Sequence, residues 1–430
     1  MAVCSDTSSA TDWEAILSLH APRVTTMSFG TTAAAELLEA VPSRIPSTHP
    51  LHQPRNLTAV ERERYRVIAK RSRRQAILAA SGELDSIHAP NVPVLDANTL
   101  MPQLPSNGLR ALSAYSGGGG LDLGFERAGF EHVASYELLQ HAADTLQRNR
   151  PDWEIFGGLD AGDVTKVDWR SWRDKVDIYH GGPPCQPFSS AGRQQGNLDP
   201  RDCWPATVDA IKKIQPLAFI CENVPALASA KFADYVQGTI IKPLESARPR
   251  WYVQRIFLQA RDFGVPQVRR RVVFVGFRSK EAADRFVPPS PTHAWATEGD
   301  ELPATLGART ALGLAPEDGV VDGLAPTIRS GLSGPRFTTS VCNSTSAART
   351  WESLGLWPNG VAADRLAASR FPAESGAFRL SVADVALIQG FPADWSWPGT
   401  VYKAIGQIGN AVPPPLGWAI AAQVATALKG

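Results

Sequence analysis

The stretch LSAYSGGGGLDLGF, residues 112–125, decides the fold class of this 430-residue chain. Its first four residues form a short apolar run typical of a strand, and a helical pattern follows the glycines as far as Ala128. Strand, glycine turn and helix in succession are typical of a nucleotide-type binding site. The glycines let a ligand approach the backbone closely where the helix begins. A plain flexible turn is the alternative for these residues taken alone.

Apolar runs alternate with helical stretches over the following 150 or so residues. We expect strands at 109–115, 131–136, 176–180, 216–221, 251–258 and 271–277, and helices at 138–148, 204–214 and 233–247. This alternation predicts an α/β fold with a doubly wound, mostly parallel sheet and helices on both faces.

A cysteine follows a Pro-Pro pair in GGPPCQPFS, residues 181–189. Proline fixes its own φ and restricts the residue before it, so this loop should be stiff. The loop comes after the apolar run 176–179, and open α/β sheets place ligand chemistry at the carboxyl ends of strands. Cys185 is therefore predicted to be a nucleophile rather than a buried structural cysteine.

Carboxylates end three further apolar runs. Glu137 is expected to hydrogen-bond ribose hydroxyls, as the acid does in dinucleotide folds. Asp163 is suited to an adenine amino group, and a turn or helix-capping acid is the alternative. Glu222 should face the same crevice as Cys185, because both follow strands of the predicted sheet.

Three arginines precede the last predicted strand, in QVRRR at 267–271. Strand alternation should aim Arg269 and Arg271 to one face and Arg270 to the other. Two guanidiniums on one face can bind a phosphate or pair with the acidic site. Arg270 is better interpreted as a solvated residue at the start of the strand.

In this order, the motifs Pro-Pro-Cys-Gln, Glu-Asn-Val and Gln-x-Arg-x-Arg resemble the cytosine-5 DNA methyltransferase family of the restriction–modification type. QGFP at 389–392 and QIGNAVP at 407–413 resemble its last signatures, so the similarity covers about 107–278 and 379–430. Tyr115 stands where a phenylalanine is usual, Leu121 where an aromatic residue is usual and Ala411 where serine is common. The first two departures affect only how the cofactor is packed.

The resemblance implies methylation of cytosine carbon 5 within a specific double-stranded DNA sequence, on a Rossmann-like catalytic domain with S-adenosylmethionine as cofactor. It implies that Cys185 attacks a flipped-out base, that Glu222 binds its N3 and amine, that Arg269 orients it and steadies both residues, and that Arg271 completes the catalytic set. The implied cofactor contacts are Tyr115, Ser116, Gly117, Gly119, Gly120, Leu121, Glu137, Leu138, Asp163, Val164, Pro184, Asn410 and Ala411. The expected DNA contacts are Gln186, Ser189, Gln267, Arg329 and Arg336, with Asn343 as a candidate for adenine.

The resemblance also divides the chain. Residues 107–278 form the catalytic and cofactor-binding domain, 279–378 the target-recognition region, and 379–430 a carboxyl segment that returns to the catalytic domain. The last strand should pack antiparallel at the sheet edge. Residues 1–106 form a partly disordered extension with a basic helix at about 58–81, which either packs on the core through Val60, Ile68 and Leu78 or adds DNA contacts.

Composition limits the remaining possibilities. The five cysteines show no metal-ligand spacing, so no metal is expected and a reducing compartment is favoured. The net charge of +1 means that DNA affinity must come from local basic patches. The chain shows no apolar run of the roughly 18 residues that span a bilayer, and no signal pattern at its start. We therefore expect a cytoplasmic monomer that works beside a restriction endonuclease of the same specificity.

Three alternatives remain. Cys221 could be the nucleophile in place of Cys185, although strand alternation points it away from Glu222. A tRNA cytosine-5 methyltransferase would share the Pro-Pro-Cys and Glu-Asn-Val signatures, but with a compact recognition region. A catalytically idle DNA-binding regulator would not need Cys185, Glu222 and Arg269 intact.

Overall fold

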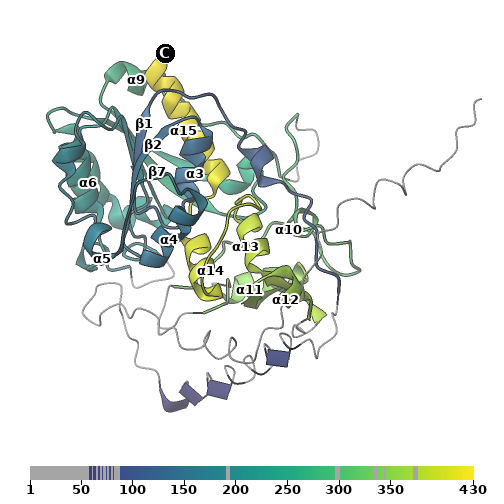
Figure 1. Cartoon of the computed structure of the whole chain (residues 1–430). Helices are drawn as coiled ribbons and strands as arrows, with labels where there is room; N and C mark the ends of the chain where they lie inside the picture. The colour runs from purple at the N-terminus through teal and green to yellow at the C-terminus, as the bar shows by residue number, and fades with distance from the viewer. Residues whose placement is uncertain are drawn as a thin grey trace, which may run out of the picture. The chain divides into compact units, whose positions relative to one another are not determined.

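The computed structural model describes residues 88–430, apart from 190–193, 296–300, 333–337, 343 and 371–375, and scattered positions between 58 and 81. A seven-stranded sheet in the order β3-β2-β1-β4-β5-β7-β6 organises the described chain (Figure 1). Its strands are β1 (Arg110–Ala114), β2 (Glu131–Glu137), β3 (Ile155–Gly157), β4 (Ile178–Gly181), β5 (Ala218–Asn223), β6 (Tyr252–Gln259) and β7 (Arg270–Phe277). All six predicted strands are present, and β3 was missed because three residues carry too little pattern.

The strand directions confirm a mostly parallel sheet. β1 to β5 run parallel, whereas β7 is antiparallel to both β5 and β6. The expected place of β7 at the sheet edge is wrong, because β7 lies one strand inside and β6 forms the edge. The reason is burial: seven of the eight residues of β7 are buried, whereas most of β6 is partly exposed.

Helices cover both faces of the sheet, as the doubly wound pattern predicted (Figure 1). α3 (Gly120–Arg127), α9 (Lys280–Arg285) and α15 (Pro414–Lys429) pack on one face. α6 (Trp204–Ile214) and the helical stretch 233–245 pack on the other face. This stretch consists of α7 (Ala233–Tyr235), a π-helical segment and α8 (Lys242–Glu245), rather than the single helix expected at 233–247.

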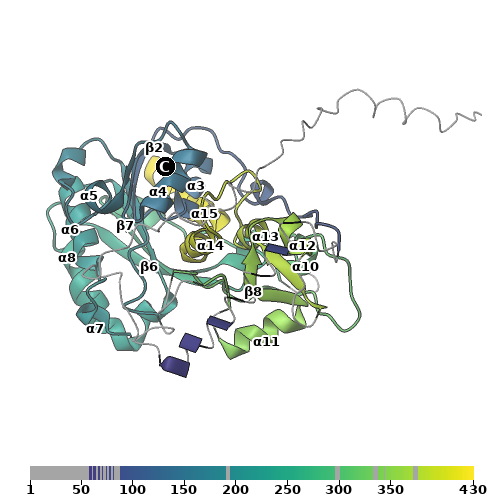
Figure 2. The same cartoon turned by 60° about the horizontal axis from the view of Figure 1, so that its bottom comes forward.

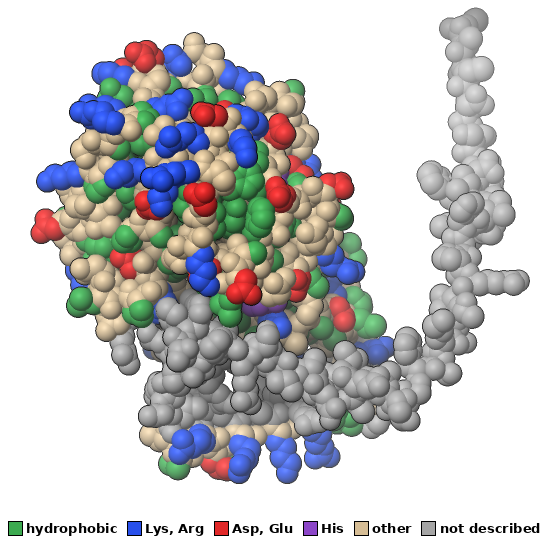
Figure 3. Space-filling view, turned by 60° about the vertical axis from the view of Figure 1, so that its left-hand side comes forward, with side chains coloured by type: hydrophobic (Ala, Val, Ile, Leu, Met, Phe, Trp, Pro, Cys, Tyr) green, Lys and Arg blue, Asp and Glu red, His purple; other side chains and the backbone are tan. Residues whose placement is uncertain are grey.

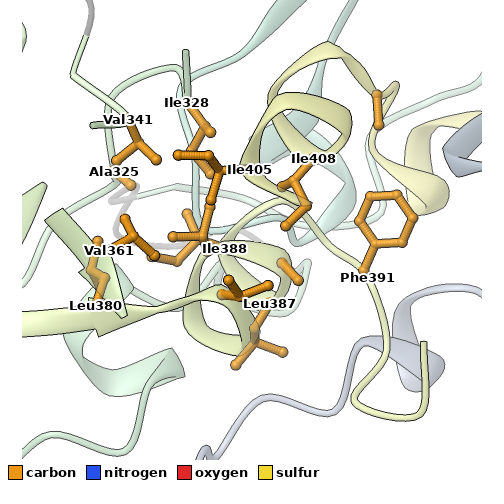
Figure 4. Close-up of a cluster of buried hydrophobic side chains, with 14 of the residues drawn as sticks. Ala325, Ile328, Val341, Val361, Leu380, Leu387, Ile388, Phe391, Ile405 and Ile408 are labelled. Carbon is orange, nitrogen blue, oxygen red and sulfur yellow. The ribbon is translucent and has the colours of Figure 1, made fainter. Parts of the chain in front are cut away.

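A second group of elements lies beside the sheet (Figure 2). It contains the parallel pair β8 (Leu356–Ala362) and β9 (Phe378–Ser381), with α10 (Ala308–Ala311), α11 (Thr345–Ser353), α12 (Arg365–Arg370), α13 (Val382–Ile388) and α14 (Val401–Asn410). Figure 4 shows its core, in which Ile388 and Ile405 pack with Ile328 and Val341. The helices α13 and α14 therefore share a core with residues that precede them by about 60 positions.

The segment 91–107, of which the sequence assigned all but Asn107 to a separate extension, packs against both groups of elements. Met101 is fully buried, and the side-chain amide of Asn91 donates to the carbonyl of Leu312 and to Asp384 of α13. At its other end, the carbonyl of Pro102 accepts a hydrogen bond from the Trp418 indole of α15. These residues are part of the folded core, although no motif marks them.

The described positions between 59 and 78 are helical, in agreement with the predicted basic helix. Val60 is 79% exposed, so the expectation that it anchors this helix on the core is wrong. Ile68 lies outside the described residues. On the molecular face of Figure 3, Lys and Arg side chains are mixed with acidic and hydrophobic ones, as the small net charge requires. No described helix is both long and apolar enough to cross a membrane.

Candidate active site

The loop that carries Cys185 leaves the carboxyl end of β4 and is held by its neighbour β5. The side-chain amide of Asn223, the last residue of β5, donates to the carbonyl of Pro183 at 3.0 Å. The backbone N–H groups of Phe188 and Ser189 then donate to the carbonyl of Cys185 at 3.0 and 2.9 Å. Cys185 thus lies in a tight turn at the carboxyl ends of the parallel strands, where it was predicted to lie.

Two side chains that the motifs did not single out fix this loop. Asn223 is fully buried, and its amide is the fixed point of the Pro-Pro backbone. Phe188 is also fully buried, with its ring 5.3 Å from that of Phe232 and 5.1 Å from that of Tyr235. Asn223 stands inside the Glu-Asn-Val motif and Phe188 inside the stretch 181–189, but their partners are known only from the fold.

Glu222 lies in the same crevice and is paired with Arg271. Both side chains are about nine-tenths buried, and the Nε atom of Arg271 is 2.5 Å from Oε1 of Glu222. A Cβ atom added to Gly182 would lie 3.1 Å from Oε2 of Glu222, so the cysteine loop runs directly over this carboxylate. The structure therefore brings the cysteine loop, Glu222 and Arg271 together.

Cys221 is fully buried among the side chains of the opposite sheet face. Burial raises the pKa of its thiol far above the ordinary range. The alternation that was expected to turn Cys221 away from Glu222 is thus present in the structure.

Burial and charge act in opposite directions on the two reactive groups. Burial raises the pKa of the Cys185 thiol, while the guanidiniums of Arg271 and Arg269 lower it. Burial also raises the pKa of Glu222, and the same two arginines oppose this effect. The Cys185 thiol therefore stays protonated near neutral pH, and Glu222 takes up a proton more readily than an ordinary glutamate does.

Arg269 is 1% exposed, and its contacts differ from those expected. Its Nη2 atom donates to the carbonyls of Gly409 and Ala411, both at 2.9 Å, and Nη1 donates to Ile328. The direct partner of Glu222 is Arg271 instead. Arg269, directly before β7, joins this strand to the end of α14, and its guanidinium still lowers the pKa of the Cys185 thiol.

Gln267 was expected to contact DNA, and its burial contradicts this. Its side chain is fully buried; the amide donates to Gln389 Oε1 at 2.7 Å, and its oxygen accepts from the N–H of Ile328 at 3.1 Å. All of its polar atoms are thus occupied by other parts of the protein. Gln267 fastens the second group of elements to the sheet.

The glycine turn lies at the carboxyl end of β1, beside Glu137 at the end of β2. The carboxylate of Glu137 accepts the N–H groups of Gly117 and Leu139, both at 2.7 Å. Gly119 has a φ of +82°, and a Cβ atom there would come within 2.6 Å of Leu146. A Cβ atom at Gly120 would meet the carbonyl of Val412. Only glycine fits at these positions.

Other predicted cofactor residues surround this turn with different exposure. Leu121, Val164 and Ala411 are buried; Leu138, Asp163 and Pro184 are half-buried; Asn410 is exposed. Ser116 is buried, and its hydroxyl donates to Ser113. The carboxylate of Asp163 accepts from the hydroxyl and N–H of Thr165, so it acts as a turn acid in this structure. The hydroxyl of Tyr115, which a phenylalanine would lack, meets Thr207 of α6 at 3.0 Å.

The other expected DNA contacts are spread around the cysteine loop and the second group of elements. Gln186, Ser189 and Arg329 are each half-buried. Arg336 and Asn343 lie outside the described residues. Within the described ranges, no three His, Cys, Asp or Glu side chains gather as metal ligands.

Comparison with known proteins agrees with this geometry. The model of the family "C-5 cytosine-specific DNA methylase" matches residues 109–311 and 335–426. The type II methyltransferase M.NgoMIV of Neisseria gonorrhoeae is 34% identical over 329 residues, 74% of this chain and 98% of that protein. M.NaeI of Lentzea aerocolonigenes is 34% identical over 324 residues, 75% of this chain and 76% of that protein. This chain belongs to the C-5 cytosine-specific DNA methylase family and is a DNA (cytosine-5) methyltransferase.

Proposed function

We propose that this enzyme methylates cytosine within one specific double-stranded DNA sequence, through a covalent bond between Cys185 and a flipped-out base. The observation that carries the proposal is the meeting of the cysteine loop with the buried pair of Glu222 and Arg271. A ring atom inside a stacked duplex cannot reach side chains that are about nine-tenths buried, so the target base must leave the helix.

The glycine turn and its neighbours fit S-adenosylmethionine as the cofactor. A Cβ atom added to Gly117 would meet only the carbonyl of Tyr115, at 4.0 Å, so this glycine faces open space. Glu137 keeps lone pairs on both oxygens beyond the two N–H groups that it accepts. Pro184 brings the cysteine loop to the same edge, so the turn, Glu137 and Pro184 would hold the ligand. When bound, S-adenosylmethionine supplies the methyl group.

The pocket residues divide the work on the base. The thiol proton of Cys185 passes to solvent water as the sulfur adds to carbon 6 of cytosine, and this addition makes carbon 5 electron-rich. Glu222 donates a proton or hydrogen bond to N3, where the ring charge develops, and accepts one from the exocyclic amine. Arg271 holds this carboxyl group in place and stabilises negative charge in the pocket. After carbon 5 has gained the methyl group, solvent water takes its proton, and the electrons of the C5–H bond restore the C5–C6 double bond. The C6–S bond breaks with its electron pair on sulfur, and N3 returns its proton to Glu222.

We propose that residues 279–378 read the DNA sequence. Arg329 and Arg336 are candidates for guanine edges or phosphates, with Gln186 and Ser189 at the gap left by the flipped base. The curated relatives named above are type II methyltransferases. We propose that this enzyme likewise protects host DNA from an endonuclease of the same specificity, and that it acts as a monomer.

Duplexes that contain 5-fluorocytosine test the covalent step, because fluorine cannot leave as a proton does. The wild type should form an adduct that survives denaturation, and Cys185→Ala should form none. Cys221→Ala is the matched control and should retain the adduct. Bisulfite sequencing of DNA from cells that express the wild type supplies the target site. An adduct in Cys185→Ala, or its loss in Cys221→Ala alone, contradicts the proposal.

A further inference from the structure

An arginine stacked on an exposed phenylalanine lies next to the active site and has no part in the chemistry described above. The guanidinium carbon of Arg270 is 4.5 Å from the centre of the Phe257 ring. Arg270 is exposed, and Phe257 is 42% exposed although it belongs to a strand. Within the part of the chain that the structure describes, Arg270 forms no ion pair with a carboxylate. This cation is therefore displayed to solvent rather than neutralised by the protein.

The strand directions place this pair at one end of the sheet, where the parallel strands β1 to β5 have their carboxyl ends. β7 is antiparallel to β5, so it begins where β5 ends, and Arg270 is its first residue. β6 is antiparallel to β7, so Phe257 lies near the same end of the sheet, at the end of β6. Glu222 lies at the same end of the sheet, on β5, which is the neighbour of β7. The stacked pair therefore lies at the same end of the sheet as Glu222, with its side chains on the opposite sheet face.

The pair also lies on the side of the active site that the cofactor leaves open. The glycine turn follows β1, which is separated from β7 by β4 and β5. Arg271 turns inward to Glu222, and its Nη1 atom also donates to the carbonyl of Arg270 at 2.8 Å. The guanidinium of Arg271 thus holds the backbone of Arg270 in place.

We propose that Arg270, held over the ring of Phe257, binds a backbone phosphate of the DNA next to the target cytosine. The inference rests on the DNA substrate of the proposed function. A guanidinium presents a planar fork of donors that matches a phosphate group. Stacking on an aromatic ring restricts the side chain in advance, so less entropy is lost when the phosphate binds. Phosphate contacts fix the register of the protein on the duplex without reading its sequence.

The salt dependence of DNA binding isolates this contact, because each neutralised phosphate steepens the slope of log affinity against log salt by about 0.9. A 30-base-pair duplex of unrelated sequence serves as the probe. Arg270→Gln should lower the slope by about 0.9, and it should weaken binding about tenfold at low salt. Arg270→Lys should restore the slope, because the charge returns. Phe257→Leu should weaken binding several-fold at an unchanged slope, since only the restriction of the side chain is lost.

The same strand offers a matched control. The guanidinium carbon of Arg250 lies 4.7 Å from the ring centre of Tyr252, at the opposite end of β6 and so far from the carboxyl ends of the parallel strands. Arg250→Gln should leave both affinity and slope unchanged. If the wild type and Arg270→Gln show the same salt slope, the inference is wrong. It is also wrong if Arg270→Gln and Arg250→Gln lose the same amount of DNA affinity. A wild type that transfers no methyl group to DNA overturns the proposed function itself, whereas methylation with unchanged Arg270→Gln binding overturns the phosphate contact alone.

Discussion

Replacing Arg271 with leucine should make the stability of the protein fall more steeply with pH than that of the wild type. The pair of Arg271 and Glu222 is about nine-tenths buried. Without the guanidinium, the carboxylate would remain as an uncompensated buried charge, which costs about 3–5 kcal/mol in typical pairs. Glu222 can avoid this cost by taking up a proton, because burial already raises its pKa.

The cost of that proton sets the expected size of the effect. At pH 7, protonating a carboxyl group with an ordinary pKa of about 4.3 costs about 3.7 kcal/mol, at 1.36 kcal/mol for each pH unit. At pH 5.5 the same step costs about 1.6 kcal/mol. The folded variant keeps a proton that its unfolded chain has released, so its free energy of unfolding falls as pH rises from about 4.3 to the pKa in the folded state. The difference from the wild type should therefore shrink by up to about 2 kcal/mol between pH 7 and 5.5.

Urea denaturation at the two pH values measures this difference, and Glu222→Gln provides the background that isolates it. In that background no carboxyl group is left to titrate at this position. The effect of Arg271→Leu should then be the same at both pH values, because the guanidinium itself does not titrate in this range. An equal cost of Arg271→Leu at both pH values in the wild-type background would refute the reasoning. A pH-dependent cost that persists in the Glu222→Gln background would refute it as well.

Three further outcomes are expected. Glu222→Gln should slow single-turnover methyl transfer about 10²–10⁴-fold, the usual contribution of an acid–base group, and a near-normal rate would remove it from the mechanism. Alkylation of the Cys185 peptide, followed by mass spectrometry, should keep rising with pH beyond the ordinary thiol pKa of about 8.5, since burial raises that pKa; a plateau at neutral pH would contradict this. Deleting residues 1–87 should leave the methylated sequence unchanged, whereas deletion through residue 105 should also lower the unfolding temperature, because buried Met101 is lost; equal unfolding temperatures would refute this core role.

The sequence predicted the sheet well because its strands are apolar runs that end in motif residues. Alternation along β5 correctly separated Cys221 from Glu222, since side-chain direction in a strand depends only on residue parity. The place of β7 was not predictable in the same way. Strand order depends on which strand has both faces and both edges buried, and this is a property of the assembled sheet.

The segment 91–107 shows a second limit of the sequence. Its contacts join residues that are more than 200 positions apart, such as Asn91 with Leu312 and Pro102 with Trp418. Neither end carries a periodic pattern, because the segment is mostly irregular and bonds through single side chains and carbonyls. Patterns that repeat along the chain identify helices and strands, and they do not identify a connection of this kind.

The motif at 267–271 shows most clearly what the sequence cannot predict. Its three polar residues Gln267, Arg269 and Arg271 make different contacts in the structure. The alternation of side chains correctly places Arg269 and Arg271 on the same face. It does not show which of the two arginines reaches Glu222. Arg271 meets Glu222, whereas Arg269 and Gln267 are beyond the pocket and bind Ile328 and the elements after it. The strand that orients the Glu222 carboxyl group is thus also the one to which the second group of elements is fastened. A change in how that group sits on DNA would reach Glu222 through only a few residues of backbone, so the region proposed to read the sequence and the pocket proposed to carry out the reaction are mechanically adjacent.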